Sequence, residues 1–263
     1  MNVTFDSNVY RPLVSPATFQ NDPDSAHFNV IRQAIKDKKL CGFLGEPVFT
    51  FEAIKKLDRK AFFGTYKGDV SISQELTSAN KAKLSITIGP SKTHTASNNP
   101  YLERHLNDAL SLNFKILRVP RIGGLKNVDN KDEYFADDIA FPAAQRQERC
   151  GELSRKIEEN GCGIAHIKTI ASRHGKGKSL FEGIEAAPAS ESGLIERAIA
   201  EWADGDSISA HYAYGNNCFC TRDNAKAAGA DSVLSPENRR WLSVEYKLIF
   251  VTPKELAEII HRG

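Results

Sequence analysis

The sequence predicts an α/β fold in which a central, mostly parallel sheet lies between two layers of helices. Two observations predict this three-layer α-β-α arrangement. Short strand-like runs alternate with helical stretches at both ends of the 263-residue chain, and such alternation is typical of parallel sheets. The run at 248–251 is apolar throughout, as expected of a strand buried on both faces. Alternating polar and apolar residues in the middle of the chain predict an additional β-containing insertion.

The N-terminal part predicts the order strand, helix, strand, helix. Residues 3–5 favour a strand that ends at Asp6, and residues 25–40 carry an apolar stripe at helical spacing. A second short strand is expected at 41–44. A helix at 46–60 follows it, because Pro47 is well tolerated in a first helical turn.

The C-terminal part repeats this order. Its predicted elements are helices at 193–202 and 206–214 with a break at Gly205, a strand at 218–221 that stops before Asp223, a helix from Ser235-Pro236, a strand at 248–251 and a last helix to about His261. Ser235 suits an N-cap and Pro236 suits the first helical position. These units would complete the parallel sheet.

The middle of the chain differs from both ends. Its predicted elements are alternating strands at 69–73 and 83–88, a helix at 101–112, a strand at 114–120, a loop at 123–138, a helix at 143–160 and a mobile Gly-, Lys- and Ala-rich stretch at 172–190. We therefore expect one domain with its core in 1–60, about 101–120, and 191–263. Residues 61–100 and 121–190 would be insertions into that domain.

The composition is that of a soluble globular protein, with 41% hydrophobic and 26% charged residues. A net charge of +2 is too small to indicate nucleic-acid binding by itself. The five cysteines include no Cys-x-x-Cys pair, which argues against a zinc site or a disulfide framework and favours the reducing cytoplasm. We expect no secretory signal and no membrane segment, because no apolar run approaches the roughly 20 residues that a membrane helix needs.

Acidic residues follow the predicted strands at equivalent places. Asp6 and Asp223 each come directly after a short apolar strand, and Asp206 lies at the predicted start of a helix, just after Asp204. Ligands of open parallel sheets bind beyond the carboxyl ends of the strands. One such Asp is most often a turn residue or an N-cap, so the inference rests on the recurrence. Clustered carboxylates repel one another unless a cation neutralises them, and oxygen ligands suit Mg²⁺ or Mn²⁺, which can activate water against a phosphodiester.

Several segments resemble the motifs of the PIN-domain family. The opening Val3-Thr4-Phe5-Asp6-Ser7-Asn8 is similar to the family's first strand, which ends in Asp followed by Thr or Ser and then Asn. Further segments resemble the second strand with its following acidic helix (43–54), the helix that contains Asp, Ile and Ala (206–213), the strand that ends in Thr-x-Asp (219–224) and the C-terminal tail (238–242 and 249–256).

This resemblance implies a Mg²⁺- or Mn²⁺-dependent ribonuclease fold. The acidic set that it implies is Asp6, Glu52, Asp206 and Asp223, with Asp6, Asp206 and Asp223 as metal ligands and with Asn8 and Thr221 as hydrogen-bonding supports. Glu52 has the helical position that the family prefers, and Glu46, nearer the strand end, is the second choice. Small nucleases of this family are often toxins with an inhibitor protein, so an inhibitor partner or a homo-oligomer stays open.

Basic residues gather around a glycine-rich stretch, at Lys168, Arg173, Lys176 and Lys178. They would suit an RNA-binding arm, because Lys and Arg neutralise phosphates without fixed geometry. A solvated, flexible loop explains the same composition. The sequence therefore favours a metal-dependent endoribonuclease, with RNA or DNA as the substrate. The alternatives are a catalytically silent PIN-like module that binds nucleic acid or protein and, less well supported, a phosphatase of the haloacid-dehalogenase type, which would want Asp-x-Asp where this chain has Asp6-Ser7-Asn8.

Overall fold

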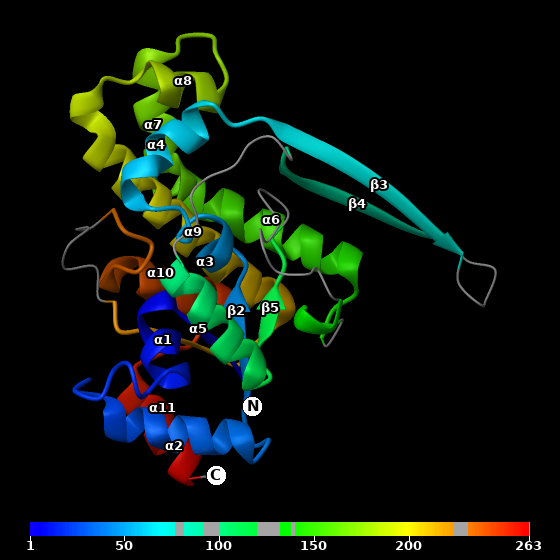
Figure 1. Ribbon diagram of the computed structural model, residues 1–263, viewed down its shortest axis with the longest axis vertical. Helices are drawn as coiled ribbons and strands as arrows, with labels where there is room; N and C mark the ends of the chain where they lie inside the picture. Colours follow the sequence, from blue (N-terminus) through cyan, green and yellow to red (C-terminus); the bar gives the residue numbers. More distant parts are fainter. Residues whose placement is uncertain (77–81, 92–99, 120–131, 138–139, 224–230, 263) are drawn as a thin grey trace.

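The computed structural model describes residues 1–76, 82–91, 100–119, 132–137, 140–223 and 231–262, and it shows a three-layer α-β-α arrangement around a parallel sheet (Figure 1). The strands of this sheet are β1 (Asn2–Phe5), β2 (Cys41–Gly45), β5 (Lys115–Leu117), β6 (Cys218–Cys220) and β7 (Phe250–Val251). Their spatial order is β5-β2-β1-β6-β7, and every neighbouring pair is parallel. The α/β class and the central parallel sheet predicted from the sequence are confirmed.

The strand order places a topological switch point between β1 and β6. The chain first builds the sheet outward from β1 through β2 to β5, and then returns to the other side of β1 with β6 and β7. Connections on the two sides therefore leave in opposite directions, and in open parallel sheets ligands bind at such a point, beyond the carboxyl ends of the strands. The register aligns these ends, because Phe5 pairs with Cys220 and each is the last residue of its strand.

Helices cover both faces of the sheet. The first face packs against α1 (Ser7–Val14), α2 (Ser25–Lys36), α5 (Pro100–Ser111) and α11 (Pro253–Arg262). The second face packs against α6 (Ala143–Glu159), α9 (Ser192–Tyr214) and α10 (Pro236–Tyr246). Alternation along β1 serves both layers, since Val3 and Phe5 enter the first core while the hydroxyl of Thr4 bonds to His211 on α9.

A separate helical unit lies beyond the carboxyl edge of the sheet (Figure 1). It consists of α4 (Lys56–Gly64), α7 (Ile164–His174), α8 (Leu180–Ala186) and the N-terminal part of α9, and it has its own hydrophobic core around Trp202. The short helices α3 (Pro47–Thr50), η1 (Asp132–Tyr134) and η2 (Ala189–Glu191) complete the described helices. Helices α7 and α8 pack closely because Gly183 has no side chain, where a Cβ would lie 2.5 Å from the carbonyl oxygen of Ala171.

A long β-hairpin projects from the body of the molecule (Figure 1). Its strands, β3 (Gly68–Leu76) and β4 (Ala82–Pro90), are antiparallel and form a two-stranded sheet of their own. This hairpin confirms the β-containing insertion that alternation at 69–73 and 83–88 predicts. The predicted helix at 101–112, the strand within 114–120 and the helix at 143–160 are also present as α5, β5 and α6. Most of the loop predicted at 123–138 lies outside the described residues.

Gly205 does not break a helix, as the sequence suggested, but lies inside the continuous helix α9. The Cα atoms of Gly205 and Gly163 approach so closely that a Cβ on Gly205 would lie 3.2 Å from the Cα of Gly163. The glycine therefore serves helix packing against the segment before α7. A glycine inside a helical stretch lowers helix propensity and also permits close packing, and a single sequence does not show which of these two roles it has.

Two further predictions were wrong in detail, and two helices were not predicted. The stretch at 172–190 is not without structure, because α8 begins there with a capping box between Ser179 and Glu182. The single helix expected at 46–60 is divided into α3 and α4, with a turn at 51–53 between them. The chain after Asp6 continues at once into α1, and α7 had no counterpart among the predicted elements.

No helix within the described ranges is both long enough and apolar enough to cross a membrane. The five cysteines all lie among the described residues and form no disulfide.

Candidate acidic site at the carboxyl edge of the sheet

Asp6 lies buried at the point where β1 ends and α1 begins. Its Oδ1 accepts a hydrogen bond of 2.6 Å from the backbone N–H of Ser7, which makes Asp6 the N-cap of α1. Its Oδ2 accepts bonds from the Asn8 amide at 2.7 Å and from the Thr221 hydroxyl at 2.6 Å. Three donors therefore fix the orientation of this carboxylate, and the N-terminal end of α1 favours its negative charge.

Asn8 and Thr221 connect the two strands on either side of the switch point. The Asn8 side-chain oxygen accepts from the backbone N–H of Arg222 at 3.1 Å, and the Thr221 hydroxyl accepts from the backbone N–H of Asp223 at 2.9 Å. Each residue thus bonds to Asp6 and to the segment that follows β6. The structure brings both supporting residues of the sequence analysis to the carboxylate that they were expected to support.

Glu52 lies in the turn after α3 and approaches Asp6 through Ser7. The Ser7 hydroxyl donates to Oε1 of Glu52 at 3.3 Å. Oε2 of Glu52 is a buried atom with no hydrogen-bond partner in the described part of the chain. Glu46 has a different task, because its Oε2 accepts from the backbone N–H of Val119 at 3.0 Å and so fastens the end of β2 to the segment after β5. The geometry favours Glu52 over Glu46 for the acidic set.

Helix α9 contributes a carboxylate to the switch point, and the geometry favours Asp204 over Asp206 for that position. Residues four and seven positions after Asp204 face β1 and β6, since Ile208 packs near Phe219 and His211 bonds to Thr4 at 2.8 Å. Residues at the same spacing after Asp206 pack elsewhere, in the cluster that contains Phe43 and Leu117 of β2 and β5. Asp206 is buried on that side of the helix.

Burial and neighbouring carboxylates raise the pKa values of Asp6, Glu52 and Asp204. Burial raises the pKa of Asp6, the hydrogen bonds from Thr221 and Ser7 lower it, and the charge of Asp223 raises it. Burial and then the charge of Asp6 raise the pKa of Glu52. Burial, followed by the charges of Asp6 and Glu52, holds the pKa of Asp204 well above its usual value, with Glu201 and Asp223 adding to the effect. The site therefore stores unfavourable negative charge, which a cation would relieve.

Arg239, on the first turns of α10, is a cation at this site that the sequence analysis did not single out. One of its terminal nitrogens donates to the backbone carbonyl of Asp223. Burial lowers the pKa of its guanidinium, and the charges of Asp223 and Asp6 raise it. Its Nε is buried and has no acceptor among the residues that the structure describes. The only sequence signal was its place one turn after the Ser235-Pro236 helix start.

A second arginine braces the site from outside. The Nε of Arg222 donates to the backbone carbonyl of Asn8 at 3.1 Å, and its Nη1 lies 2.9 Å from both carboxylate oxygens of Asp22. The paired bonds hold a planar guanidinium firmly. Arg222 thereby ties the loop before α2 to Asn8, and so to the residue that orients Asp6.

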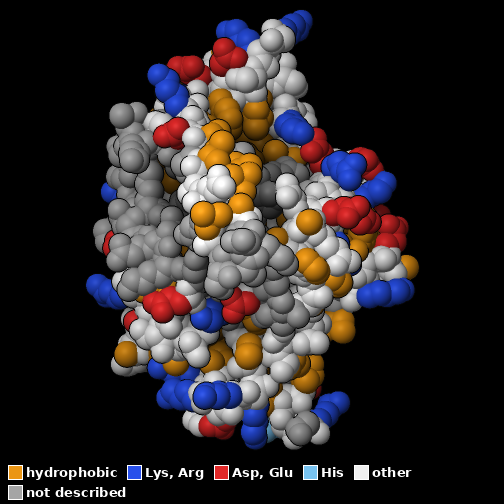
Figure 2. Space-filling model, turned by 90° about the vertical axis from the view of Figure 1, so that its right-hand side faces the viewer, with side chains coloured by type: hydrophobic (Ala, Val, Ile, Leu, Met, Phe, Trp, Pro, Cys, Tyr) orange, Lys and Arg blue, Asp and Glu red, His pale blue; other side chains and the backbone are white. Residues whose placement is uncertain are grey.

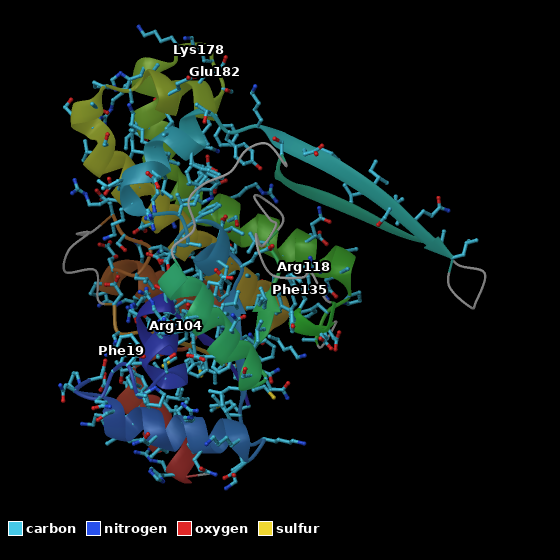
Figure 3. The ribbon with its side chains drawn as sticks, in the orientation of Figure 1. Phe19, Arg104, Arg118, Phe135, Lys178 and Glu182 are labelled. Atoms are coloured by element: carbon cyan, nitrogen blue, oxygen red, sulfur yellow. The ribbon has the colours of Figure 1, made fainter. Side chains whose placement is uncertain are left out.

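The four basic residues predicted to bind RNA are exposed on the helical unit beyond the sheet edge. Lys168 and Arg173 lie on α7, and Lys176 and Lys178 lie between α7 and α8. Lys168 pairs with Glu158, and Figure 3 shows Lys178 close to Glu182 at the tip of the unit. The structure thus places these residues on an ordered helical scaffold, and none of them appears among the contacts of the acidic site.

Among the described residues, no three His, Cys, Asp or Glu side chains lie close enough together to hold a metal ion. The chemistry of the donors still fits a hard cation, because the groups that meet here are carboxylates and because Oε2 of Glu52 is a buried acceptor without a donor. In comparisons with known proteins, no protein-family model, no curated protein and no solved structure matches this chain. The function must therefore be argued from the site itself.

Proposed function

We propose that this chain is a metal-dependent nuclease, most simply an endoribonuclease with a PIN-like fold. The observation that carries the proposal is that Asp6, Glu52, Asp204 and Asp223 interact electrostatically at the switch point of the sheet. Ligand sites of open parallel sheets lie at such points. Buried carboxylates whose pKa values are raised by neighbouring charges are a feature of functional sites, because stability alone would disfavour them.

The resemblance to PIN domains gains support from where its motifs lie. The segment around Asp6 and Asn8 and the segment around Thr221 and Asp223 are more than 200 residues apart, yet their side chains bond to one another at distances from 2.6 to 3.5 Å. A shared active site requires that these two segments lie together at one edge of the sheet. Asp206 stays in the proposal as the motif residue of α9, with Asp204 as the residue that the geometry favours.

The residues of this site would have different roles in phosphodiester hydrolysis. A bound Mg²⁺ or Mn²⁺ would neutralise the carboxylates and lower the pKa of a coordinated water. Asp6, fixed by three donors, is suited to a ligand role that needs constant geometry. Glu52 has a raised pKa and an acceptor oxygen without a partner, so it can hold a proton during attack by water.

Arg239 would contact the phosphate itself. Its guanidinium lies by Asp223, and its planar donors match the oxygens of a phosphate group. A phosphodiester gains negative charge in the transition state, and a nearby guanidinium stabilises that charge in a site with little water. The exposed lysines and arginine of the helical unit would bind more distant phosphates of the nucleic acid.

The test is cleavage of a single-stranded RNA with Mg²⁺ or Mn²⁺ by the wild type, by Asp6→Asn and by Asp37→Asn. Asp37 is an exposed residue at the end of α2, where nearby Lys39 accepts a hydrogen bond from Met1, just before β1, so it lies away from the strand end that carries the site and serves as the matched control. We expect the wild type and Asp37→Asn to cleave equally and Asp6→Asn to be inactive.

Equal cleavage by the wild type and Asp6→Asn would exclude the assignment. A wild type that binds RNA but neither cleaves RNA or DNA nor binds Mn²⁺ in calorimetric titration would show that the chain is a catalytically silent binding module.

A further inference from the structure

The hairpin of β3 and β4 exposes more large aliphatic side chains than any other described element. The exposed fractions are 57% for Val70, 66% for Ile72, 81% for Leu76, 61% for Leu84 and 59% for Ile86. Isolated exposed aliphatic residues are common on protein surfaces, but five on one hairpin are a continuous patch. In Figure 2, which views the molecule from the side toward which the hairpin points, hydrophobic side chains gather in the upper middle of the surface.

These five side chains share one face, which we call the hairpin face. Ile72 is directly opposite Ile86, and Gln74 is directly opposite Leu84, so Leu84 and Ile86 lie on the side of the even-numbered residues of β3. Val70, Ile72 and Leu76 lie on the same side because side chains alternate along a strand. The opposite face carries polar residues such as Asp69 and Ser73. The hairpin is therefore amphipathic, with its apolar face turned away from any described packing partner.

Such a hairpin requires a partner on its apolar face. A two-stranded sheet is marginally stable in water unless it packs against another layer. Among the described residues, β3 and β4 pair only with each other. The alternation of the sequence over both strands is that of a half-buried sheet, and no cover for its apolar face is found in the described part of the chain.

The chemistry of the hairpin face selects the kind of partner. Its five exposed hydrophobic residues are all aliphatic, with no aromatic ring that would stack on a base. Membrane-surface elements combine an apolar face with Trp or Phe and with a border of several Lys and Arg, whereas the two strands contain one basic residue, Lys83, which is directly opposite Glu75. An aliphatic and uncharged face is instead typical of the interface between identical subunits, which is more apolar than other interfaces.

We propose that the hairpin face is a dimerisation surface on which a second copy of this chain packs its own hairpin face. Two such hairpins stacked face to face form a four-stranded sandwich of two layers, in which each aliphatic side chain meets its equivalents across a two-fold axis.

The exposed area of the hairpin face is sufficient for this dimer. Each of the five side chains exposes on the order of 100 Å², and two copies together therefore bury roughly 1,000 Å², which is about the area that a specific interface needs. The net charge of +2 is small, so two copies do not repel each other strongly.

Sedimentation velocity over about 1–100 μM tests the proposal with three proteins, because interfaces of this small area are often weak or transient. They are the wild type, the double variant Ile72→Ser/Ile86→Ser, and Leu57→Ser as the matched control. Leu57 is 89% exposed but lies on α4, away from the hairpin. We expect a concentration-dependent dimer for the wild type and for Leu57→Ser. The double variant should raise the dimer dissociation constant at least ~100-fold, because two buried aliphatic side chains are lost from each copy.

Circular dichroism and thermal melting of the three proteins show whether the double variant keeps its fold. If that variant does not fold, Leu84→Lys replaces it, since this charge alters the hairpin face without touching a buried residue. A wild type that stays monomeric at every concentration would overturn the proposal, as would a dimer that both hairpin variants leave unchanged. Flotation of a monomeric wild type with phosphatidylcholine vesicles, lost in the double variant, would overturn it in favour of a membrane-binding hairpin.

Discussion

The acidic site and the hairpin face depart from ordinary protein surfaces in opposite ways. At the acidic site, carboxylates are buried beside one another, and their pKa values rise because neither water nor nearby cations fully offset their charge. On the hairpin, aliphatic side chains are exposed although their sequence pattern is that of a buried face. Each arrangement raises the free energy of the isolated chain, and a partner would lower it. The partner is a cation for the acidic site and an apolar surface for the hairpin face.

The two regions also differ in how rigidly they are built. Asp6 is held by donors from α1, the helix that it caps, and from the segment after β6, and Arg222 braces that arrangement through Asn8. The hairpin face has no such framework and depends on contact area alone. Single substitutions at the acidic site should therefore have large and specific effects on chemistry, whereas substitutions on the hairpin should act through the sum of several contacts.

The largest expected effect separates two carboxylates on the same helix. Asp204→Asn should reduce RNA cleavage by at least ~100-fold, a loss typical of removing one charged or polar group that acts directly on the transition state. Asp206→Asn should retain most of the activity, because Ala210 and Ala213, one and two turns after Asp206 on the same side of α9, lie in the cluster beneath β2 and β5. Initial rates with Mn²⁺ for both variants provide the measurement. If Asp206→Asn lost more activity than Asp204→Asn, then Asp206 would be the functional carboxylate of α9, as the family resemblance implies.

A smaller effect is expected at Thr221, whose hydroxyl positions Asp6 and also accepts from the backbone of Asp223. Thr221→Val should lower kcat by about 10- to 100-fold with little change in KM, because groups that orient a ligand act on chemistry more than on substrate binding. Thr169→Val is the matched control, since Thr169 is exposed on α7 and bonds only to its own helix. A change in KM alone would show that Thr221 contributes to binding and not to positioning.

Much of the acidic site could be predicted from the sequence, and the missing parts have identifiable causes. Asp6 and Asp223 follow predicted strands, so the rule that ligands bind beyond the carboxyl ends of parallel strands placed them, whereas Asn8 and Thr221 were expected only from the resemblance to PIN domains. The choice between Asp204 and Asp206 depends on the rotation of α9 about its axis, which no local pattern specifies. Arg239 and Arg222 were missed because a guanidinium several bonds from the backbone can reach many places, so its partner emerges only from tertiary structure.

The fold shows the same division between local and tertiary information. Strands, the hairpin and most helices were predicted because their periodicity is local. Gly205 was misjudged because its role is contact with Gly163, more than 40 residues away in the chain. The position of the helical unit beyond the sheet edge was equally inaccessible, since its core joins Phe51, Ile167 and Trp202 from three separate regions.

The smallest expected effect is on stability, and its sign follows from the pKa of Asp204. The pKa of this carboxyl in the folded protein is well above 3.8, its usual value, because of burial and the neighbouring charges of Asp6 and Glu52. Between these two pKa values the folded state binds more protons than the unfolded state, so the free energy of unfolding falls as pH rises through this window. Asp204→Asn removes the charge and should raise the Tm at pH 7, by about 2–4 °C for each kcal/mol that is relieved.

The gain should disappear below about pH 4, where the carboxyl is protonated in both the folded and the unfolded state. Thermal melts of the wild type and Asp204→Asn at pH 4 and pH 7 test this expectation. Addition of Mn²⁺ at pH 7 should raise the Tm of the wild type more than that of the variant, because a ligand that binds only the folded state stabilises it. A lower Tm for Asp204→Asn at pH 7 would mean that the ionised carboxylate already has a compensating partner. In that case the acidic site would need no further partner, and it would differ from the hairpin face, whose apolar side chains remain exposed in the isolated chain.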